Sequence, residues 1–230
     1  MTKNIQTYYQ KFPDTKLKPL PNDILITSQG VKDVMRWKGL PLYKSVYDFA
    51  LISMILWKLQ PKTIFEMGSG EGGSAVWMSD LCRMYGNEDC YIHSVDIEIP
   101  QTAQFLQWPI HKTKIFFLEG DTNEIEKIFP DLSIYPHPWL ILEDAHQNIT
   151  GIVKMFSEAM EKGDYLIIED VRGSINKILD TLLPALNSTG MKRSHHYTDF
   201  FGPNATANSI WYKEHNEVYN NNHATRGDTG

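Results

Sequence analysis

The sequence predicts an α/β protein built on a mostly parallel, doubly wound sheet with helices on both faces. Three observations predict this fold. From residue 62 onward, short apolar runs alternate with segments that carry apolar residues at helical spacing. A loop with four glycines joins the first apolar run to the first of these helical segments. Two later apolar runs each end in a pair of acids, at the sheet edge where such folds bind ligands.

The elements follow from the pattern in chain order. Residues 1–30 are polar and interrupted by prolines, so we expect a partly irregular N-terminal arm or lid. Helical spacing predicts a helix over residues 45–59, which Pro61 ends. The predicted strands lie near residues 62–67, 91–96, 114–118, 138–143, 164–168 and 207–213. The predicted helices lie near residues 73–86, 122–129, 148–162 and 174–188.

This order of elements divides the chain into three parts. An N-terminal arm and helix over residues 1–60 would act as a lid or in association. Residues 61–213 form the main α/β domain, and residues 214–230 are predicted to be a disordered polar tail. A chain of 230 residues is long enough for one such domain with a sizeable core.

Composition and charge exclude several classes of protein. The formal net charge is −6 and the sequence has no basic stripe, which argues against nucleic acid as a partner. No stretch approaches eighteen uninterrupted apolar residues, and the N-terminus lacks an apolar signal core. We therefore expect a cytoplasmic protein with no membrane partner, in which Cys82 and Cys90 are reduced thiols.

The glycine-rich loop predicts a nucleoside cofactor. It follows Glu66 and contains the candidate cofactor-binding residues Gly68, Ser69, Gly70, Gly72 and Ser74. Glycines let the backbone approach a ligand closely because they carry no Cβ. The next apolar run ends in Asp96, whose carboxylate can accept hydrogen bonds from both ribose hydroxyls of a nucleoside. The alternative is a loop that only turns a strand into a helix.

The spacing of the glycines favours S-adenosylmethionine (SAM) among the adenosine cofactors. It is not the G-x-G-x-x-G of dinucleotide-binding proteins, and no lysine follows the glycines as in a phosphate-binding loop. Glu66 would repel a pyrophosphate but suits the amino group of a methionine moiety. An NAD-dependent enzyme is therefore disfavoured.

Two acid pairs predict a metal site. The pairs and one nearby histidine follow the fourth and fifth predicted strands: Glu143, Asp144, His146, Glu169 and Asp170. Carboxylates that meet at one sheet edge repel one another unless a cation lies among them. Mg²⁺ with oxygen ligands is the natural neutraliser. The alternative is that each acid caps the helix after its strand.

His146 is the candidate general base, because the pKa of a histidine lies near the working pH. A local hydrogen bond at a helix start is the alternative role for this side chain. His195 and His196 precede the last predicted strand and could rival His146 as the base. Aromatic residues could form the wall of an acceptor pocket, although such residues more often belong to a core: Trp37, Tyr43, Trp108, Tyr197 and Phe200.

Several motifs over about residues 30–175 carry a resemblance to a known family. They are RWKG at 36–39, TIFEMG at 63–68, GGS at 72–74, Asp96, EGD at 119–121, EDAH at 143–146 and GDYLIIED at 163–170. With these motifs the sequence resembles the cephalosporin hydroxylase family of class I SAM-dependent methyltransferases. Over the acids it is also similar to Mg-dependent macrolide sugar O-methyltransferases. The resemblance implies a Rossmann-like class I SAM methyltransferase fold.

The resemblance also implies a role for each matching residue. The metal ligands would be Glu143, Glu169 and Asp170, with Asp144 as a secondary candidate, because the family usually has Asp where this chain has Glu143. His146 would be the base, so Glu143 and His146 form the catalytic pair. Glu66 and the glycine loop would hold the methionine portion of SAM, and Asp96 the ribose. Gly120 and Asp121 would lie near the adenine.

The function expected from this reading is SAM- and Mg²⁺-dependent O-methylation of a hydroxyl on a small natural-product or sugar-like acceptor. We also expect a homo-oligomer, in which the N-terminal arm and the region of Trp37 could mediate association. Two alternatives stay open. One is a metal-independent methyltransferase, and the other is a SAM-fold partner protein that assists another tailoring enzyme.

Overall fold

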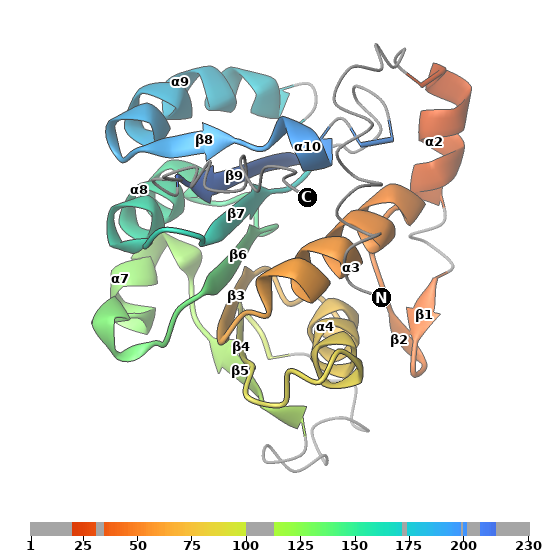
Figure 1. The fold of residues 1–230 in the computed structure, drawn as a ribbon, viewed down its shortest axis with the longest axis horizontal. Helices are drawn as coiled ribbons and strands as arrows, with labels where there is room; N and C mark the ends of the chain where they lie inside the picture. The colour runs from red at the N-terminus through yellow and green to blue at the C-terminus, as the bar shows by residue number, and fades with distance from the viewer. Residues whose placement is uncertain are drawn as a thin grey trace, which may run out of the picture.

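Seven of the nine described strands form one sheet. The structure is a computed structural model, and it describes residues 20–30, 35–99, 113–171, 174–198, 200–201 and 208–214. The strand order of the sheet is β5-β4-β3-β6-β7-β9-β8 (Figure 1). The strands are β3 (Thr63–Met67), β4 (Tyr91–Asp96), β5 (Ile115–Glu119), β6 (Trp139–Glu143), β7 (Tyr165–Ile168), β8 (Met191–Arg193) and β9 (Ser209–Lys213).

The sheet is mostly parallel, as the sequence predicts. Strands β5, β4, β3, β6 and β7 are parallel neighbours, whereas β9 pairs antiparallel with both β7 and β8. The strand order reverses between β3 and β6, so the carboxyl ends of these strands border the crevice where doubly wound folds bind ligands. The six predicted strands all form, and the short strand β8 was not predicted.

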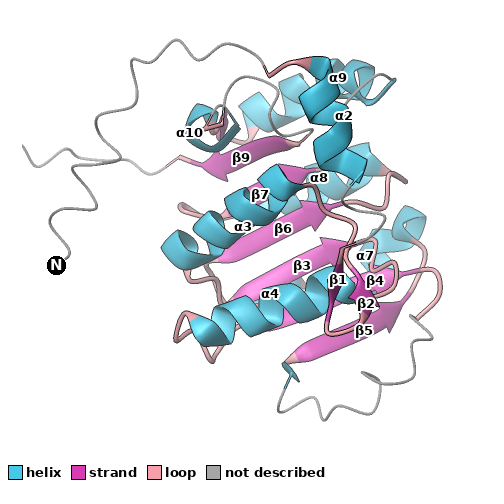
Figure 2. Ribbon diagram, turned by 90° about the vertical axis from the view of Figure 1, so that its right-hand side faces the viewer, coloured by secondary structure: helices cyan, strands magenta, loops and turns pink. Residues whose placement is uncertain are grey.

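Helices cover both faces of the sheet (Figures 1 and 2). One face carries α3 (Val46–Leu59) and α4 (Gly73–Met84), and the other carries α7 (Ile125–Ile128), α8 (Ile149–Ala159) and α9 (Ser174–Ser188). The remaining elements are α2 (Asn22–Gly30), α10 (His195–Thr198) and the 3₁₀ helices η2 (Thr122–Glu124) and η3 (Leu132–Ile134). None of the described helices is long and apolar enough to span a membrane.

The core consists of two apolar clusters separated by the sheet. Successive side chains of a strand point to opposite faces, so Ile64 joins the cluster under α3 and α4, and Phe65 joins the cluster under α8. The ring of Phe65 packs edge-on against Phe129 and Trp139, each with its centroid 5.2 Å away. A strand buried on both faces must be apolar throughout, which explains the continuous apolar runs of the sequence.

The chain before α3 is more ordered than the sequence predicts. Residues 22–30 form α2, and a two-stranded hairpin follows, made of β1 (Arg36–Trp37) and β2 (Leu40–Pro41). The hairpin is held on α4 because Trp37 Nε1 donates to Asp80 Oδ2 at 2.8 Å. Local patterns could not indicate this contact, since the two residues lie 43 positions apart. Residues 1–19 of the predicted arm and residues 215–230 of the predicted tail lie outside the described residues.

Helix α3 begins and ends at sequence signals. The side chain of Ser45 caps its start by accepting a hydrogen bond from Asp48 N at 3.2 Å. Gln60 ends it in the left-handed conformation, with a φ of 49°, and Pro61 follows. The cap therefore fixes the start of α3, and with it the backbone position of Lys44, the residue directly before the cap.

Candidate active site

The glycine loop between β3 and α4 is shaped partly by packing within the chain. A Cβ on Gly68 would lie 2.8 Å from the carbonyl carbon of Asp144, and a Cβ on Gly73 would lie 1.9 Å from the carbonyl oxygen of Pro41. Gly68 thus lets the end of β3 approach the end of β6, and Gly73 lets the hairpin lie on α4. A Cβ on Gly70 would meet no backbone atom within 4 Å and would make an ordinary contact with the ring of Tyr43 at 3.8 Å.

Glu66 lies beneath this loop and is 1% exposed. It accepts hydrogen bonds from Ser74 Oγ and, at 2.5 Å, from Ser94 Oγ. Burial raises the pKa of Glu66 to about 6, and Lys44 opposes that rise. The carboxylate therefore links the start of α4 to β4 and adds negative charge directly under the loop.

Asp96 lies beside the glycine loop, as the sequence predicts. Its side chain accepts hydrogen bonds from Gly70 N at 2.9 Å and from Ile97 N at 2.8 Å. Gly120 N donates to the carbonyl of Asp96 at 2.8 Å, which brings the end of β5 next to it. Asp121 follows and caps η2 through Asn123 N. The predicted ribose and adenine residues therefore lie together at the end of the sheet.

The other cofactor-loop residues also lie at this edge. Ser69 N donates to the carbonyl of Val95 at 3.1 Å, and Ser69 Oγ lies 2.6 Å from Ser94 Oγ. Gly72 takes a φ of 78° as the N-cap residue of α4. Ser74 is in the first turn of that helix, and its Oγ donates a hydrogen bond to Glu66. Every residue of the predicted cofactor set thus belongs to β3, β4, the turns after β3 and β5, or the first turn of α4.

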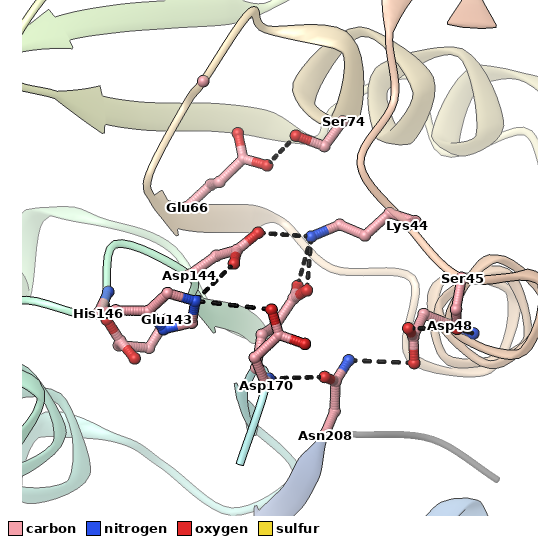
Figure 3. A network of polar contacts seen from close by, with 12 residues as sticks. Lys44, Ser45, Asp48, Glu66, Ser74, Glu143, Asp144, His146, Asp170 and Asn208 are labelled. Atoms are coloured by element: carbon pink, nitrogen blue, oxygen red, sulfur yellow. Dashed lines mark hydrogen bonds and ion pairs between the residues drawn. The ribbon is translucent and has the colours of Figure 1, made fainter. Parts of the chain in front are cut away.

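Lys44 lies among the carboxylates at the ends of β6 and β7 (Figure 3). Its Nζ donates to Asp144 Oδ2 at 2.8 Å and to both oxygens of Glu169 at 2.6 Å. Burial lowers the pKa of Lys44, but the surrounding acids outweigh burial and leave that pKa well above its ordinary value. The sequence predicts a cation among these carboxylates, and the ammonium group of Lys44 lies there.

Glu143 and Glu169, two of the predicted ligands, are buried. Burial raises the pKa of Glu143 to about 7. Its Oε1 accepts from His146 N at 2.9 Å, and its Oε2 is a buried atom without a hydrogen-bond partner. Burial and the neighbouring Asp144 raise the pKa of Glu169, against the effect of Lys44. In this arrangement Glu169 is engaged by Lys44, and Glu143 holds the backbone of His146.

Asp144, His146 and Asp170 form a group that could hold a metal ion, with one ligand atom from each lying within 4.8 Å of the others. His146 Nε2 is 3.5 Å from Asp144 Oδ1 and 3.7 Å from Asp170 Oδ2 (Figure 3). His146 and Asp170 both have left-handed backbones, with φ values of 57° and 52°. A non-glycine residue rarely adopts this conformation, so the two strand ends are shaped to converge.

The donor set suits a divalent cation. Two carboxylates and one imidazole are common ligands of divalent metals in proteins, and carboxylate oxygens are those that Mg²⁺ prefers. Lys44 is a single ammonium group beside Asp144, Glu169 and Asp170, so carboxylates outnumber ammonium groups at this edge of the sheet. The buried, unpartnered Oε2 of Glu143 shows the same excess of acceptors over donors. The residues present therefore fit the metal, although the gathered set includes Asp144 and His146 in place of Glu143 and Glu169.

The histidines differ in their surroundings. The interaction with Asp170 raises the pKa of His146, burial opposes that rise, and the side chain is 35% exposed. His196 packs against Tyr197 and Phe200, and burial lowers its pKa. His195 begins α10, the helix that leads into this aromatic cluster. His146 is the histidine that meets the acids in the described part of the chain.

Few of the predicted pocket aromatics point to a pocket. Trp37 anchors the hairpin, Tyr197 is 2% exposed within the core, and Phe200 packs against that core. Trp108 lies outside the described residues. Tyr43, by contrast, is 50% exposed, and its ring would lie 3.8 Å from a Cβ on Gly70. It is the aromatic side chain of this set best placed to meet a ligand at the loop.

Curated relatives and solved structures match this chain. The rhamnosyl O-methyltransferase of Mycobacterium leprae (strain TN) is 29% identical over 140 residues, which cover 58% of this chain and 59% of that protein. The protein of the same name from Mycobacterium tuberculosis is 26% identical over 140 residues, 58% of this chain and 56% of that protein. The chain thus spans less than two thirds of the length of these relatives.

Solved structures extend the likeness to the fold. A CmcI structure described as "Mg-SAM" is 27% identical, with a TM-score of 0.65 over 79% of this chain and 77% of that chain. The O-methyltransferase TomG from Streptomyces achromogenes is 12% identical, with a TM-score of 0.53 over 92% of this chain and 96% of that chain, and shows the fold alone. The fold is the Rossmann-like fold of class I SAM-dependent O-methyltransferases.

A family model described as "Rhamnosyl O-methyltransferase/CmcI" matches residues 29–186. The match begins before the hairpin and ends within α9, so it includes the glycine loop, Lys44 and both acid pairs. More than half of the chain lies within it. The chain belongs to the Rhamnosyl O-methyltransferase/CmcI family.

Proposed function

We propose that the chain is a SAM-dependent, divalent-metal-dependent O-methyltransferase that acts on a hydroxyl of a small, sugar-like acceptor. The observation that carries the proposal is the convergence of Asp144, His146 and Asp170 within 4.8 Å, at the ends of β6 and β7. These strand ends adjoin the glycine loop, since Asp144 N donates to the carbonyl of Met67 at 2.9 Å. A methyl donor on the loop would therefore lie near an acceptor oxygen at the acids.

The relatives support each part of this proposal. The mycobacterial proteins are named for O-methylation of a rhamnosyl group, which points to a sugar hydroxyl as the acceptor. The CmcI structure carries Mg and SAM in its description, which supports both cofactors. We assign the loop over residues 68–74 and Glu66 to the methionine portion of SAM, Asp96 to the ribose, and Gly120 and Asp121 to the adenine side.

Asp144 and Asp170 would hold the metal, with Glu169 as a further carboxylate beside them, so the ring of His146 would keep a nitrogen lone pair for a proton. When bound, Mg²⁺ supplies Lewis acidity that lowers the pKa of a bound hydroxyl and fixes its direction. Methyl transfer from a sulfonium is an in-line displacement, so the protein must align the acceptor oxygen with the methyl group. A vicinal diol, as found in sugars, has two neighbouring oxygens and would suit a chelating metal site of this kind.

His146 is the proposed proton acceptor. Glu143 fixes its backbone through the 2.9 Å hydrogen bond to His146 N, and Asp144 and Asp170 flank its ring. The acids raise the pKa of His146, which strengthens it as a base and places its neutral form at higher pH. Tyr43, whose ring is the nearest neighbour of a Cβ on Gly70, would help to exclude water from the methyl group.

Calorimetric titration tests the proposal. SAM and S-adenosylhomocysteine are titrated into the protein with Mg²⁺ and then with EDTA, followed by methyl rhamnoside and other diol-bearing sugars. We expect SAM binding under both conditions and acceptor binding only with Mg²⁺, followed by methyl transfer detected by mass spectrometry. Failure to bind SAM would overturn the proposal, and binding of SAM without transfer to any sugar would favour a non-catalytic partner protein.

One observation favours a second candidate, a metal-independent methyltransferase. Lys44 already provides a positive charge at the acids, within 2.8 Å of Asp144 and 2.6 Å of Glu169. A lysine ammonium there could orient an acceptor oxygen without a metal. Methyl transfer that proceeds at an unchanged rate in EDTA would select this candidate over the first.

The proposal includes a cytoplasmic location and self-association, with a small molecule as the acceptor. Light scattering after size-exclusion chromatography measures the oligomeric state directly. A mass of one chain at micromolar concentration would remove the homo-oligomer from the proposal and leave the chemistry untouched.

A further inference from the structure

Lys44 is a buried lysine whose position is fixed from both ends. Its side chain is 2% exposed, and its backbone N–H donates to the carbonyl of Leu42 at 3.0 Å, directly before the Ser45 cap of α3. From that point the side chain reaches the ends of β6 and β7 (Figure 3). Partners 100 and 125 positions away along the chain therefore converge on one ammonium group.

The carboxylates that Lys44 binds belong to the metal site. Asp144 is shared, because its Oδ2 accepts from Lys44 at 2.8 Å while its Oδ1 lies 3.5 Å from His146 Nε2. Both oxygens of Glu169 accept from Lys44, so a metal ion that binds Glu169 has to share this carboxylate with the ammonium group or displace it. A divalent cation at Asp144 and Asp170 would stand next to the ammonium group, and two cations so close repel each other.

We propose that Lys44 competes with the divalent cation. Lys44 holds Glu169 and one oxygen of Asp144, and metal binding displaces it from Glu169, which then joins the site. This inference rests on the proposed function and deepens it, because it assigns Lys44 as a positioning residue for the metal site. It also explains how the acids stay together when no metal is bound.

The competition predicts a gain in metal affinity when the lysine charge is removed. We expect Lys44→Met to bind Mn²⁺, measured by electron paramagnetic resonance, about tenfold or more tightly than the unaltered protein, because the change releases Glu169 to the metal and removes a nearby positive charge. The double variant Lys44→Met with Glu169→Gln should lose most of that gain, since the released carboxylate is its source. Lys38→Met is the matched control, because Lys38 is 48% exposed and pairs with Asp80 on α4.

A Mn²⁺ affinity of Lys44→Met that equals or falls below that of the unaltered protein would overturn the competition. So would a full gain in the double variant, or the absence of Mn²⁺ binding in every variant. SAM binding is measured on the same samples by calorimetry. Loss of SAM binding reports failure of the proposed function, whereas intact SAM binding with unchanged metal affinity reports failure of this inference alone.

Removing Lys44 leaves the buried Glu169 and the partly exposed Asp144 without their cation, which destabilises the fold when no metal is bound. A measurement on the unaltered protein therefore complements the variant. NMR of ¹⁵N-labelled lysine ammonium groups should show a slowly exchanging signal that is absent from Lys44→Arg, because Lys44 is buried and fully hydrogen-bonded. Addition of Mg²⁺ should remove that signal, and calorimetry shows when the protein is saturated with Mg²⁺. A signal that persists unchanged in the Mg²⁺-saturated protein would overturn the displacement.

Discussion

The chemistry of the site depends on side chains whose surroundings give similar residues different properties. Glu66, Glu143 and Glu169 are all buried, but each meets different donors: two hydroxyls, a backbone N–H and an ammonium group. Asp144 and Asp170 are less buried and flank the ring of His146. The buried acids therefore shape the site, and the more exposed ones are available to ligands.

Substitution of His146 tests the base directly. We expect His146→Ala to lower kcat by roughly 10²–10⁴-fold, the usual contribution of a positioned base, with SAM affinity unchanged because the residue lies on the acid side of the crevice. Steady-state kinetics and calorimetry measure the two quantities. His195→Ala is the comparison, and a large kcat loss there with activity retained in His146→Ala would reassign the base.

Substitution of Asp170 tests the metal group. We expect Asp170→Asn to weaken Mn²⁺ binding by about tenfold or more, because it removes one of two carboxylates from a three-residue set. Asp131→Asn serves as the control, since Asp131 caps the distant helix η3. Equal Mn²⁺ affinity in the two variants would remove Asp170 from the metal site.

Elements of the fold deliver these residues, and the sequence predicts the elements better than their contacts. Apolar runs locate β3 to β7 because a strand buried on both faces must be apolar. Glu66, Asp96 and the acid pairs could be predicted because they end such strands. Lys44 could not, because its role depends on the hairpin and α3 packing onto residues 100 or more positions away. The glycines were predicted to let a ligand approach, yet Gly68 and Gly73 also let the backbone of Asp144 and Pro41 pack closely against the loop.

The packing of the hairpin on α4 depends on Gly73. We expect Gly73→Ala to lower the free energy of unfolding by about 2 kcal/mol or more, because its Cβ would lie 1.9 Å from the carbonyl oxygen of Pro41. Thermal unfolding measures this loss. Gly86→Ala is the control, since its Cβ would meet no atom within 4 Å and only its φ of 76° opposes the change. A smaller loss in Gly73→Ala than in Gly86→Ala would contradict this account.

Strand β4 carries a histidine that makes stability depend on pH. Burial lowers the pKa of His93 to about 4, and its ring stacks on Phe116 at 5.1 Å. The unfolded chain binds a proton below about pH 6.5 and the folded chain only near pH 4, so stability falls as the pH drops through this window. We expect a loss of about 2 kcal/mol, reduced for partial solvent access. Urea unfolding of His93→Phe, which keeps the ring, should show a smaller loss between pH 7 and pH 4, and an identical loss would exclude His93 as its cause.

At the scale of the whole molecule, the cofactor side and the acid side meet at the reversal point of the sheet. Gly68 packs against the backbone of Asp144, and Asp144 N donates to Met67 at 2.9 Å. The proposed methyl donor and acceptor sites therefore share the ends of β3 and β6, two adjacent strands of one rigid sheet. Ligand binding at this edge should stabilise the entire fold, because both core clusters pack on the same strands.

Thermal unfolding with SAM tests that expectation. A ligand that binds only the folded chain adds about 2.7 kcal/mol at a concentration of 100 Kd. For a chain of this size, each kcal/mol raises Tm by about 2–4 °C, so SAM should raise it by roughly 5–11 °C. Asp96→Asn should reduce the shift, because Asp96 is the proposed ribose acceptor and already receives Gly70 N. Asp89→Asn is the control, because Asp89 is 77% exposed and precedes the start of β4, at the opposite end of the strand that Asp96 ends. If SAM shifts Tm equally in both variants, Asp96 does not hold the ribose. If NAD rather than SAM raises Tm, the identification of the cofactor from Glu66 and the glycine spacing is wrong.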